Sequence, residues 1–572
     1  MKPRESTNEE KAPQAQKECC MGKRVLVTTA WPYANGPLHL GHLAGSCLPA
    51  DIFARYNRMM GNETRMVSGT DEHGTPISMR AEVEGRSPKG IVDNYHERIK
   101  RSLYDVGCSY DLFTRTTTRN HRETAQDFFL KLLEHDFIYE KAMDMLYCPK
   151  CNKSLPDRYV EGKCPKCGSE GARGDQCDAC GRTLDTTELI NPYCKSCGTT
   201  PEMRETRHYF FRLTAFQDRL LSWIKTKKDL WRPNVYKFTI NWLKEGVEDR
   251  PITRDLKWGV PVPIKGEEDK VIYVWFEAVI GYISATKQYF AEQGKSDAWR
   301  VWWEDPDTET YYFIGKDNIP FHTIIWPAML LGYEGLNIPT NVIGNEFLNL
   351  EGDKFSTSKN YAVWLDEYLE HFDPDPLRYY LSINMPESKD ANFTWDEFQR
   401  RNNEELVSTF GNFAHRVLSF IEKFHDGIIP EPYDLDEKDL SVLKEIELAV
   451  DVTDNFLQNC EFKKAIARVM KLASFGNQYF NEKEPWKDKA MSKTTLHLSA
   501  CIIKALAILM APFLPFSAQR LWSMLGYESS VHEQRLQSAK NPIESQPVRD
   551  VKPLFRIIEG DEIAEQKTKL DR

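Results

Sequence analysis

Cysteine spacing constrains this chain more than any other feature of its sequence. Eight of the fourteen cysteines form four C-x-x-C pairs within residues 148–197. In a long chain that begins with no secretory-signal pattern, such pairs indicate metal binding rather than disulfides. Eight thiolates predict two tetrahedral Zn²⁺ sites, and because four cysteines leave no open position on the ion, the zinc is expected to be structural. Spacing alone leaves three ways of combining the pairs, which are Cys148/Cys151, Cys164/Cys167, Cys177/Cys180 and Cys194/Cys197.

Alternating strands and helices flank this segment. Before it, short β-branched runs predict strands at 23–30 and 64–76, and helices are expected at 40–61, 77–106 and 120–136. After it, strands at 270–275, 310–317 and 341–350 alternate with helices at 276–290 and 320–332. This alternation predicts an α/β fold with one parallel sheet, split by the cysteine-rich insertion.

Long amphipathic helices are expected after residue 400. Apolar residues recur there every three or four positions, at Leu406, Phe410, Phe413, Val417, Phe420 and Phe424, which is typical of a helix with one buried face. Similar patterns continue to about 526 and predict a helix bundle, followed by a polar, partly extended tail over 530–572. The apolar run at 505–516 is too short to span a bilayer, so we interpret it as a buried helix ending near Pro512.

Charge and the N-terminal residues restrict the class of protein further. The formal net charge of −10 argues against a nonspecific polyanion binder, although it is compatible with a basic groove on an acidic body. Residues 1–22 mix both charge signs without an apolar core, so they match neither a secretory signal nor an acid-poor transit peptide. We expect them to be a disordered extension of a cytoplasmic protein.

Two histidines stand where the first strand gives way to a helix. In "WPYANGPLHLGH" (31–42), His39 and His42 lie three apart on the first helical turn and point the same way. A helix N-terminus attracts a phosphate, Gly41 lets a ligand approach the backbone, and an imidazole can donate to a phosphate oxygen. The pair therefore fits a site that stabilises charge on a transferring phosphoryl group. Much later, "KFSTSK" (354–359) predicts a polar, lysine-bearing loop that could close over a triphosphate.

The two segments together resemble the HIGH and KMSKS motifs of class I aminoacyl-tRNA synthetases. Further motifs narrow the resemblance to methionyl-tRNA synthetases, over about residues 23–560. These motifs are "AWPYANGPLHLGH" (30–42), "GTDEHGTP" (69–76), "YVWFEAVIGY" (273–282), "FIGKDNIPFH" (313–322) and "NEKEPW" (481–486). The cysteine pattern and "KFSTS" look most like the archaeal or eukaryotic cytosolic branch.

The resemblance implies a Rossmann-type catalytic domain in two halves and a helical anticodon-binding domain. It divides the chain into a disordered N-terminal extension (1–22), a first catalytic half (23–140), a connective insertion with zinc knuckles (141–255), a second catalytic half (256–345), a KMSKS-like loop and stem-contact region (346–400), an anticodon-binding domain (401–550) and a C-terminal tail (551–572). The insertion is too short, and too rich in cysteine, to be the large editing domain of the leucine, isoleucine and valine enzymes.

The implied activity is methionine–tRNA ligation in two steps. Methionine attacks the α-phosphorus of ATP, bound with Mg²⁺, to give methionyl-adenylate and pyrophosphate. The terminal ribose of tRNA(Met), initiator or elongator, then accepts the methionyl group and AMP leaves. The family's ATP-contacting positions fall on His39, Gly41, His42, Lys354, Ser356, Thr357 and Ser358. Where the family has a second lysine this chain has Thr357, so Lys354 and Lys359 both remain candidates for the contact with pyrophosphate.

Substrate-binding residues are implied by the same resemblance. Asp71 is expected to pair with the substrate ammonium, although a carboxylate there could also cap the helix that begins near Pro76. Asp317 is an open candidate for contacting the substrates. Because an apolar pocket distinguishes one methylene by only about 1–3 kcal/mol, homocysteine is the expected competitor. The methionine pocket, whose aromatic faces suit a thioether and would otherwise be explained by core packing, falls on Trp31, Tyr33, Trp275, Ala278, Tyr282 and His322.

The resemblance also implies a nested cysteine pairing and an anticodon site. Asn412 and Arg416 share a helix face away from the apolar stripe, and Trp486 is available to stack on an unpaired base. These three match the family's anticodon-reading residues, whereas Trp486 alone would be interpreted as bundle core. The inner zinc site would take Cys164, Cys167, Cys177 and Cys180, and the outer site Cys148, Cys151, Cys194 and Cys197.

Two other functions remain open from the sequence. Another class I synthetase, with the cysteine enzyme closest in size, is disfavoured by the aromatic pocket and by the lack of a cysteine-ligated metal near the substrate site. A zinc-bearing RNA-binding scaffold without catalysis is disfavoured by the intact "HLGH" and by Lys354. Because the bundle is followed by no further RNA-binding domain, we expect a monomer.

Overall fold

A five-stranded parallel sheet forms the centre of the α/β part of the molecule. The computed structural model describes residues 22–174, 177, 179–180, 184–356, 360–488 and 492–570. Neighbouring strands follow the order β14–β13–β1–β2–β3, and every pair is parallel. The strands are β1 (Arg24–Thr29), β2 (Glu63–Thr70), β3 (Leu112–Arg115), β13 (Thr308–Gly315) and β14 (Asn341–Asn345).

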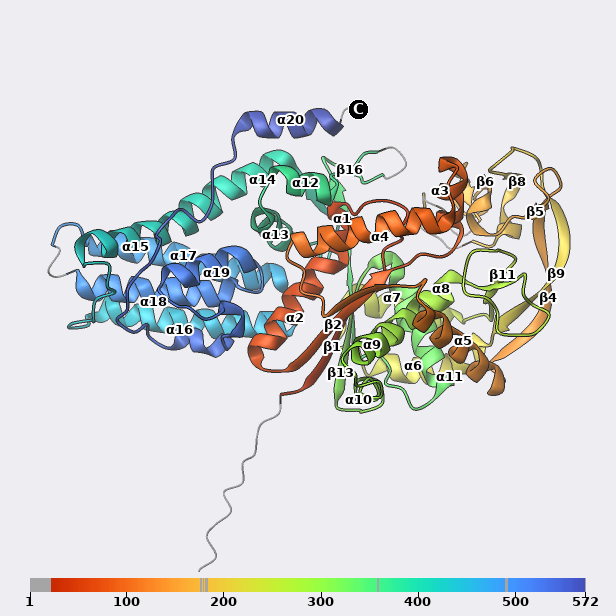
Figure 1. The fold of residues 1–572 in the computed structure, drawn as a ribbon, viewed down its shortest axis with the longest axis horizontal. Helices are drawn as coiled ribbons and strands as arrows, with labels where there is room; N and C mark the ends of the chain where they lie inside the picture. The colour runs from red at the N-terminus through yellow and green to blue at the C-terminus, as the bar shows by residue number, and fades with distance from the viewer. Residues whose placement is uncertain are drawn as a thin grey trace, which may run out of the picture.

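Helices cover both faces of this sheet (Figure 1). Along β1, Val25 and Val27 face one core and Leu26 faces the other, as expected for a strand whose side chains alternate. The first face packs against α2, α3 and α4, and the second against α5, α9 and α11. These helices are α2 (Leu48–Met60), α3 (Thr75–Glu84), α4 (Pro88–Asp105), α5 (Arg119–Glu134), α9 (Gly281–Glu292) and α11 (Trp326–Tyr333).

The insertion that splits the sheet is mainly antiparallel β structure. A long antiparallel pair, β4 and β9, is flanked by β5 and β10, and a smaller sheet of β6, β7 and β8 lies at its end. The chain then returns to the main sheet through α6 and α7, and α7 contacts β14. The bounds are β4 (Ile138–Cys148), β5 (Lys153–Ser154), β6 (Val160–Lys163), β7 (Ala172–Arg173), β8 (Ile190–Cys194), β9 (Glu202–Phe211), α6 (Gln217–Lys225), α7 (Pro233–Glu245) and β10 (Arg250–Pro251).

Two predicted strands of the second half are wrong in extent. The run 270–275 yields only β12 (Val271–Ile272), which pairs antiparallel with β11 (Thr253–Arg254) outside the main sheet. The chain turns directly into α8 (Val274–Glu277), because Tyr273 already accepts the first helical hydrogen bonds. The run 341–350 divides between β14 and the short strand β15 (Leu348–Leu350), which belongs to a separate three-stranded sheet.

Three further expectations need correction. The helix over 77–106 is interrupted, because Gly85 adopts a left-handed conformation that ends α3 and Ser87 caps α4. The four-residue strand β3 was not predicted, since it is too short to show a pattern. The tail over 530–572 is extended in part but ends in the helix α20 (Gly560–Leu570), which packs on α14 (Trp395–Arg401).

A helix bundle follows, as predicted. The helix α14 continues through a π-helical segment (Asn402–Gly411) into α15. By length and composition α18 could cross a membrane, but 94% of that helix is buried among its neighbours, which makes it a core helix that ends at Met510. The bundle helices are α15 (Asn412–Phe424), α16 (Glu437–Gln458), α17 (Phe462–Lys483), α18 (Lys493–Met510) and α19 (Pro515–Met524).

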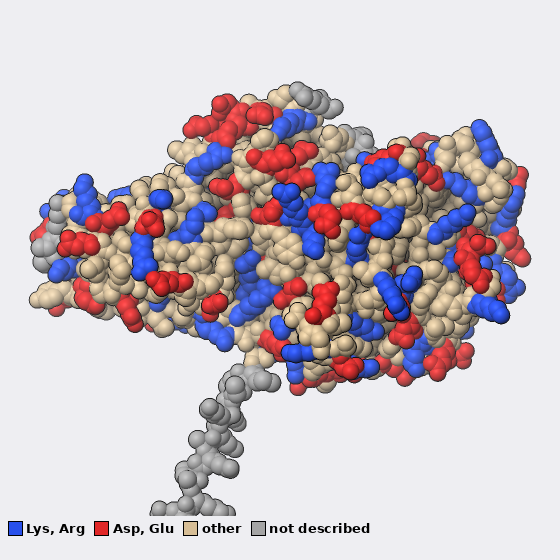
Figure 2. All heavy atoms as spheres, in the orientation of Figure 1, with Lys and Arg blue, Asp and Glu red and all other residues tan. Residues whose placement is uncertain are grey.

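The sheet and the bundle share one hydrophobic core. A connecting region joins them, and its buried side chains belong to the same cluster as Val25 of β1 and Leu506 of α18. The connecting elements are β15, β16 (Asp353–Lys354), β17 (Ala391–Phe393), α12 (Leu365–His371) and α13 (Pro374–Ile383). The predicted fold class, a split Rossmann-type sheet followed by a helical domain, is confirmed. On the face shown in Figure 2, basic and acidic side chains are interspersed.

Candidate active site

The predicted site residues gather at the carboxyl edge of the parallel sheet. Strand β1 lies between β2 and β13, and the chain adds strands first on one side and later on the other. Such a switch in strand order opens a crevice outside the carboxyl ends of the strands, where α/β proteins bind ligands. Trp31 and Tyr33 follow β1, Asp71 follows β2 and Asp317 follows β13.

His39 and His42 cap the helix that starts at this crevice. His39 Nδ1 accepts from Gly41 N–H at 3.1 Å, and His42 Nδ1 accepts from His39 N–H at 3.2 Å. A Cβ at residue 41 would lie 2.9 Å from the His39 ring, so the cap requires glycine there. Since each Nδ1 is an acceptor, the neutral rings carry their proton on Nε2.

Both imidazoles are held in the neutral form. Burial lowers the pKa of His39 well below its usual value, and the neighbouring His42 lowers it further. Burial likewise lowers the pKa of His42 to about 4. The ring centroids lie 3.9 Å apart. Near neutral pH the pair therefore offers two neutral Nε2–H donors at a helix N-terminus.

The segment 354–359 contacts the segment 31–42 through an aromatic pair. Phe355 stacks on the His39 ring with centroids 4.7 Å apart and an interplanar angle of 14°. Ser356 exchanges two backbone hydrogen bonds with Tyr361. Lys354 is exposed on β16. Three other predicted residues of the loop, Thr357, Ser358 and Lys359, lie outside the described residues.

The predicted methionine-pocket residues lie in two aromatic groups, which are linked through the adjacent residues Phe321 and His322. Trp31 lies edge-on to Tyr282, Tyr33 lies edge-on to Trp275, and Ala278 is buried beside them on the turn after α8. A Cβ at Gly69 or Gly281 would come within 2.5 or 2.7 Å of the Trp31 ring, so the two glycines make room for it.

A buried hydrogen bond between Tyr282 and His322 fixes one wall of the predicted pocket. His322 Nδ1 lies 2.9 Å from the carbonyl of Asn318, which can only accept, so Nδ1 donates. Burial lowers the pKa of His322 to about 4, so the neutral Nε2 accepts from the Tyr282 hydroxyl at 2.6 Å. The wall therefore presents aromatic carbon and few free polar groups, which suits an apolar side chain.

Asp71 lies beside a charged network that sequence reasoning missed. Its side chain is 3% exposed and accepts from His73 N–H at 3.3 Å. Behind it, the fully buried Glu277 contacts His73 Nδ1 at 2.8 Å and His121 Nε2 at 2.5 Å. His73 and Glu277 belong to the two quoted motifs 69–76 and 273–282, but only the fold shows that they meet.

Asp317 is less enclosed. It lies in a short 3₁₀ turn after β13 and is exposed. Gly315 passes so close that a Cβ would be 2.6 Å from Asp317 Oδ1. The carboxylate thus lies over the end of the strand, at the rim of the crevice.

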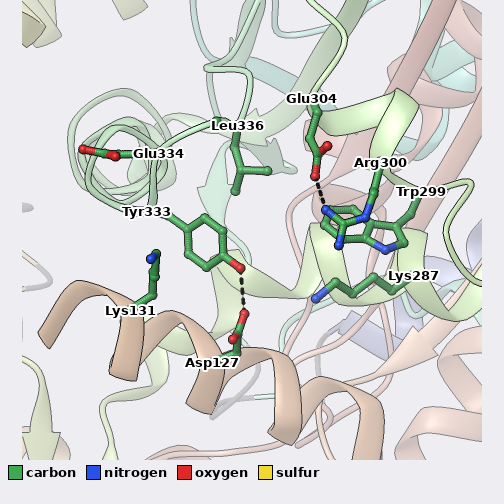
Figure 3. A pocket seen from close by; sticks show the side chains of 10 residues that line it. Asp127, Lys131, Lys287, Trp299, Arg300, Glu304, Tyr333, Glu334 and Leu336 are labelled. Atoms are coloured by element: carbon green, nitrogen blue, oxygen red, sulfur yellow. Dashed lines mark hydrogen bonds and ion pairs between the residues drawn. The ribbon is translucent and has the colours of Figure 1, made fainter. Parts of the chain in front are cut away.

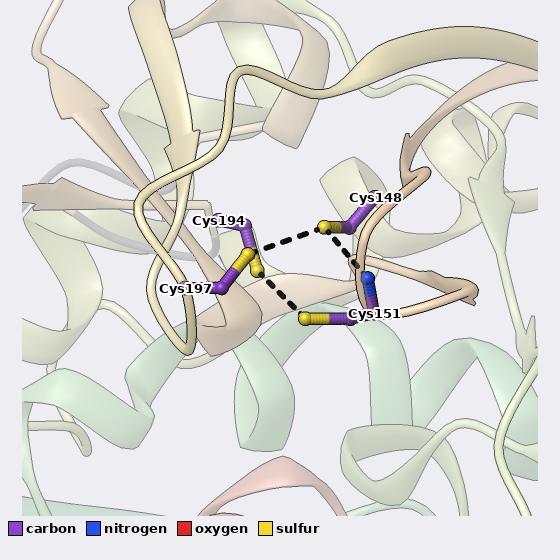
Figure 4. A group of neighbouring side chains, drawn as sticks. All are labelled: Cys148, Cys151, Cys194 and Cys197. Atoms are coloured by element: carbon purple, nitrogen blue, oxygen red, sulfur yellow. Dashed lines mark hydrogen bonds between the residues drawn. The ribbon is translucent and has the colours of Figure 1, made fainter.

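The eight cysteines form two groups of four, in the nested combination. Cys148 Sγ lies 3.5 Å from Cys197 Sγ, and Cys151 Sγ lies 3.9 Å from Cys194 Sγ (Figure 4). The inner group is Cys164, Cys167, Cys177 and Cys180, with sulfur pairs at 4.0 and 3.6 Å. A tetrahedron of sulfurs about 2.3 Å from a central Zn²⁺ has edges of about 3.8 Å. Both groups therefore fit one tetrahedral ion each.

Two of the predicted anticodon residues, Arg416 and Trp486, meet at the far end of the bundle. Arg416 donates to Asn481 Oδ1 at 3.0 Å, and its guanidinium lies over the rings of Phe480 and Trp486 at 5.3 and 6.0 Å. Trp486 is 44% exposed, so one face of its ring is free of the core. Asn412 is exposed one helical turn before Arg416.

A separate hollow of about 670 Å³ lies near the start of β13, at the opposite end of that strand (Figure 3). Several of its polar groups satisfy one another: Tyr333 donates to Asp127 at 2.8 Å, and Arg300 donates to Glu304 at 2.6 Å. It contains none of the motif residues described above.

Comparison with known proteins identifies the family. The family described as "tRNA synthetases class I (M)" matches residues 25–418, and "Anticodon-binding domain of tRNA ligase" matches 439–570. The methionine–tRNA ligase of Thermomicrobium roseum is 50% identical, over 89% of this chain and 88% of its own. The chain belongs to the methionyl-tRNA synthetase family.

Other members of the methionyl-tRNA synthetase family extend the match. The methionine–tRNA ligase of Dehalococcoides mccartyi strain CBDB1 is 50% identical over 96% of this chain and 99% of its own, and that of Pyrococcus furiosus is 48% identical over 88% and 72%. The Mycobacterium tuberculosis methionyl-tRNA synthetase in complex with methionyl-adenylate shares the fold, with a TM-score of 0.78, 24% identity, and coverage of 94% of this chain and 100% of that one.

Proposed function

We propose that this chain is a methionine–tRNA ligase that forms methionyl-adenylate and transfers the methionyl group to tRNA(Met). The observation that carries the proposal is the stacking of Phe355 on His39, which joins two signature segments more than 300 residues apart beside an aromatic pocket. The relatives that are 48–50% identical over most of the chain carry the same name.

The reaction needs no protein nucleophile, because the methionine carboxylate attacks the α-phosphorus itself. The protein's contribution is positioning and charge stabilisation. The Nε2–H groups of His39 and His42 donate to phosphate oxygens, where negative charge increases as the bond to pyrophosphate breaks. Lys354 or Lys359 holds the β,γ end of ATP, and Ser356, Thr357 and Ser358 contact ATP from the same segment. Mg²⁺ bound to ATP supplies further charge neutralisation at the phosphates.

The amino acid lies among the aromatic groups at the carboxyl edge of the sheet. Asp71 pairs with the ammonium, and Asp317 contacts the substrates from the rim. The side chain of methionine lies among Trp31, Tyr33, Trp275, Ala278, Tyr282 and His322, where aromatic faces meet its sulfur. Trp31 Nε1 is buried and has no hydrogen-bond partner among the described residues, so this donor is available to a ligand.

The other parts of the chain serve tRNA and stability. Asn412, Arg416 and Trp486 read the anticodon, with Trp486 stacking on an unpaired base. The two cysteine groups hold structural Zn²⁺, since the small core of the insertion consists largely of the cysteines themselves and a few apolar side chains. Residues 23–140 and 256–345 form the catalytic halves, 141–255 the zinc-bearing insertion, 346–400 the loop and stem-contact region and 401–550 the anticodon domain, in a cytoplasmic monomer.

Amino-acid-dependent ATP–pyrophosphate exchange without tRNA tests the activity directly. Exchange with methionine should far exceed exchange with cysteine and leucine, with homocysteine as the nearest competitor. Exchange driven by a different amino acid would leave the fold intact and reject the pocket assignment. No exchange with any of the four, from folded protein loaded with zinc, would favour an RNA-binding scaffold instead.

A further inference from the structure

Glu277 is a fully buried acid next to the proposed amino-acid site. It ends the short helix α8, and its side chain is fully buried. Its two carboxylate oxygens contact different histidines: Oε1 lies 2.8 Å from His73 Nδ1 and Oε2 lies 2.5 Å from His121 Nε2. Because a carboxylate only accepts, both ring nitrogens must donate to it.

His121 is held by buried polar groups on both sides of its ring. Its Nδ1 lies 2.9 Å from Ser284 Oγ, which also lies 3.0 Å from the carbonyl of Gly281. Its Nε2 donates to Glu277. These contacts fix the orientation of the buried Glu277 carboxylate.

Asp71 borders this network through His73. His73 links the two acids, because its backbone N–H donates to Asp71 and its ring donates to Glu277. The pKa of Asp71 is raised well above its usual range. Burial is the largest cause, the negative charge of Glu277 is the next, and Glu72 adds to the increase. Burial alone would also raise the pKa of Glu277, but His73 and His121 lower it to about 2.

Two other titratable neighbours of Asp71, Glu72 and Tyr282, do not supply the negative charge that Glu277 supplies. Glu72 is also fully buried, but Arg115 donates to it at 2.8 Å, so its charge is neutralised locally. From the other side, Tyr282 faces Asp71 as a neutral phenol, because burial raises the pKa of Tyr282 well above its usual value.

We propose that Glu277, oriented by His73 and His121, is a positioning residue for the amino-acid substrate, because it places a second buried negative charge behind Asp71 and so makes the site select a protonated amine. This inference rests on the proposed function, in which Asp71 receives the methionine ammonium.

A pair of ligands isolates the effect on the amine. Methionine carries an ammonium, and 4-(methylthio)butanoate has the same chain and carboxylate without it. Glu277→Gln keeps the size of the side chain and removes its charge. We expect the dissociation constant of methionine, followed by tryptophan fluorescence, to rise about 10- to 100-fold, as befits the loss of a charge near the ammonium. That of 4-(methylthio)butanoate should change less than about twofold.

Two measurements distinguish a positioning role of Glu277 from a role in folding: the separate effects on KM for methionine and for ATP, and the activity of a variant that keeps the charge. In ATP–pyrophosphate exchange, Glu277→Gln should raise KM for methionine and leave KM for ATP unchanged, and Glu277→Asp should recover much of the loss. Equal weakening of both ligands would overturn the inference and indicate a structural role. If the native protein bound no methionine at all, the proposed function would fail instead.

The unaltered protein provides a second test should Glu277→Gln fail to fold. Methionine affinity should increase as pH rises from about 5 to 8, because Asp71 must lose its proton to pair with the ammonium, whereas the affinity for 4-(methylthio)butanoate should not increase. Parallel pH profiles for the two ligands would reject the inference.

Discussion

Phe355 stacks on His39, with ring centroids 4.7 Å apart and nearly parallel planes. This contact links the segment after β16 to the helix start that offers Nε2–H donors to phosphate, so it can hold the lysine-bearing loop near the site. Stacked aromatic pairs contribute about 0.5–1.5 kcal/mol beyond the area that they bury. We expect Phe355→Ala to slow methionine-dependent ATP–pyrophosphate exchange about 2- to 12-fold. Methionine binding in the absence of ATP should stay unchanged.

A variant that keeps the ring provides the control for this contact. Phe355→Tyr should retain near-native exchange. If Phe355→Ala weakened methionine binding as much as it slowed exchange, the contact would act on the amino-acid pocket rather than on the ATP loop.

Loss of His42 should slow adenylate formation. Removing one donor to developing charge commonly costs about 10²- to 10³-fold, so His42→Ala should reduce the exchange rate at least about 100-fold. Because burial lowers the pKa of His42 to about 4, the native ring acts as a neutral donor near neutral pH. The ratio of native to variant rates should therefore be constant between about pH 6 and 8. A ratio that shrank as pH rose would show that the imidazolium is the active form.

The histidine pair could be found from the sequence because its geometry is local. His39, Gly41 and His42 lie within four residues, and strand–turn–helix structure places them without help from distant segments. The cysteine groups were also accessible, since C-x-x-C spacing positions each pair, although the choice between pairings came from the family resemblance rather than from spacing.

Long-range contacts explain what the sequence could not show. His121 and Glu277 are 156 residues apart and meet only because α5 packs against the segment that runs from α8 into α9. The run 270–275 looks like a core strand by composition, yet the parallel neighbours of β1 are β2 and β13. Apolar strand patterns report burial, and they do not report which partner a strand acquires.

Trp486 should act on tRNA and not on the adenylate. Its ring is 44% exposed beside the Arg416 guanidinium, at the far end of the bundle from the crevice. Stacking on a base contributes about 1–3 kcal/mol, so Trp486→Ala should reduce tRNA charging about 5- to 150-fold while exchange without tRNA stays within twofold. Leu448→Ala, at another exposed apolar residue of the bundle, should affect neither. An equal loss of charging and exchange would point to a folding defect.

Each cysteine group should hold one zinc ion. Elemental analysis of the native protein should find two zinc per chain, and Cys194→Ser should lower this to one, because sulfur distances of 3.5–3.9 Å in the outer group fit a single tetrahedral ion. Removal of zinc by a chelator should make the insertion sensitive to protease while the bundle remains resistant. A value of two zinc per chain in Cys194→Ser would show that this group does not bind the ion through all four sulfurs.

The buried pair Arg378–Asp51 should stabilise the junction between the sheet and the bundle. Arg378 donates to Asp51 of α2 at 2.7 Å and to the carbonyls of Pro512 and Phe513, which join α18 to α19. Both side chains are fully buried, and removing one partner of such a pair costs about 3–5 kcal/mol. Arg378→Met should therefore lower the denaturation midpoint clearly, whereas Lys567→Met, which breaks an exposed pair with Asp396, should cost about 0–1 kcal/mol.

The pH dependence of this pair has a defined sign. Burial would raise the pKa of Asp51, but Arg55 and Arg378 hold it below its usual range. The folded state thus binds the proton less readily than the unfolded state, so the stabilisation is present above about pH 4 and is lost as pH falls below it. The difference in unfolding midpoint between the native protein and Arg378→Met should be constant from about pH 6 to 8 and shrink in acid. A difference that grew in acid would mean that Asp51 is protonated in the folded protein at neutral pH.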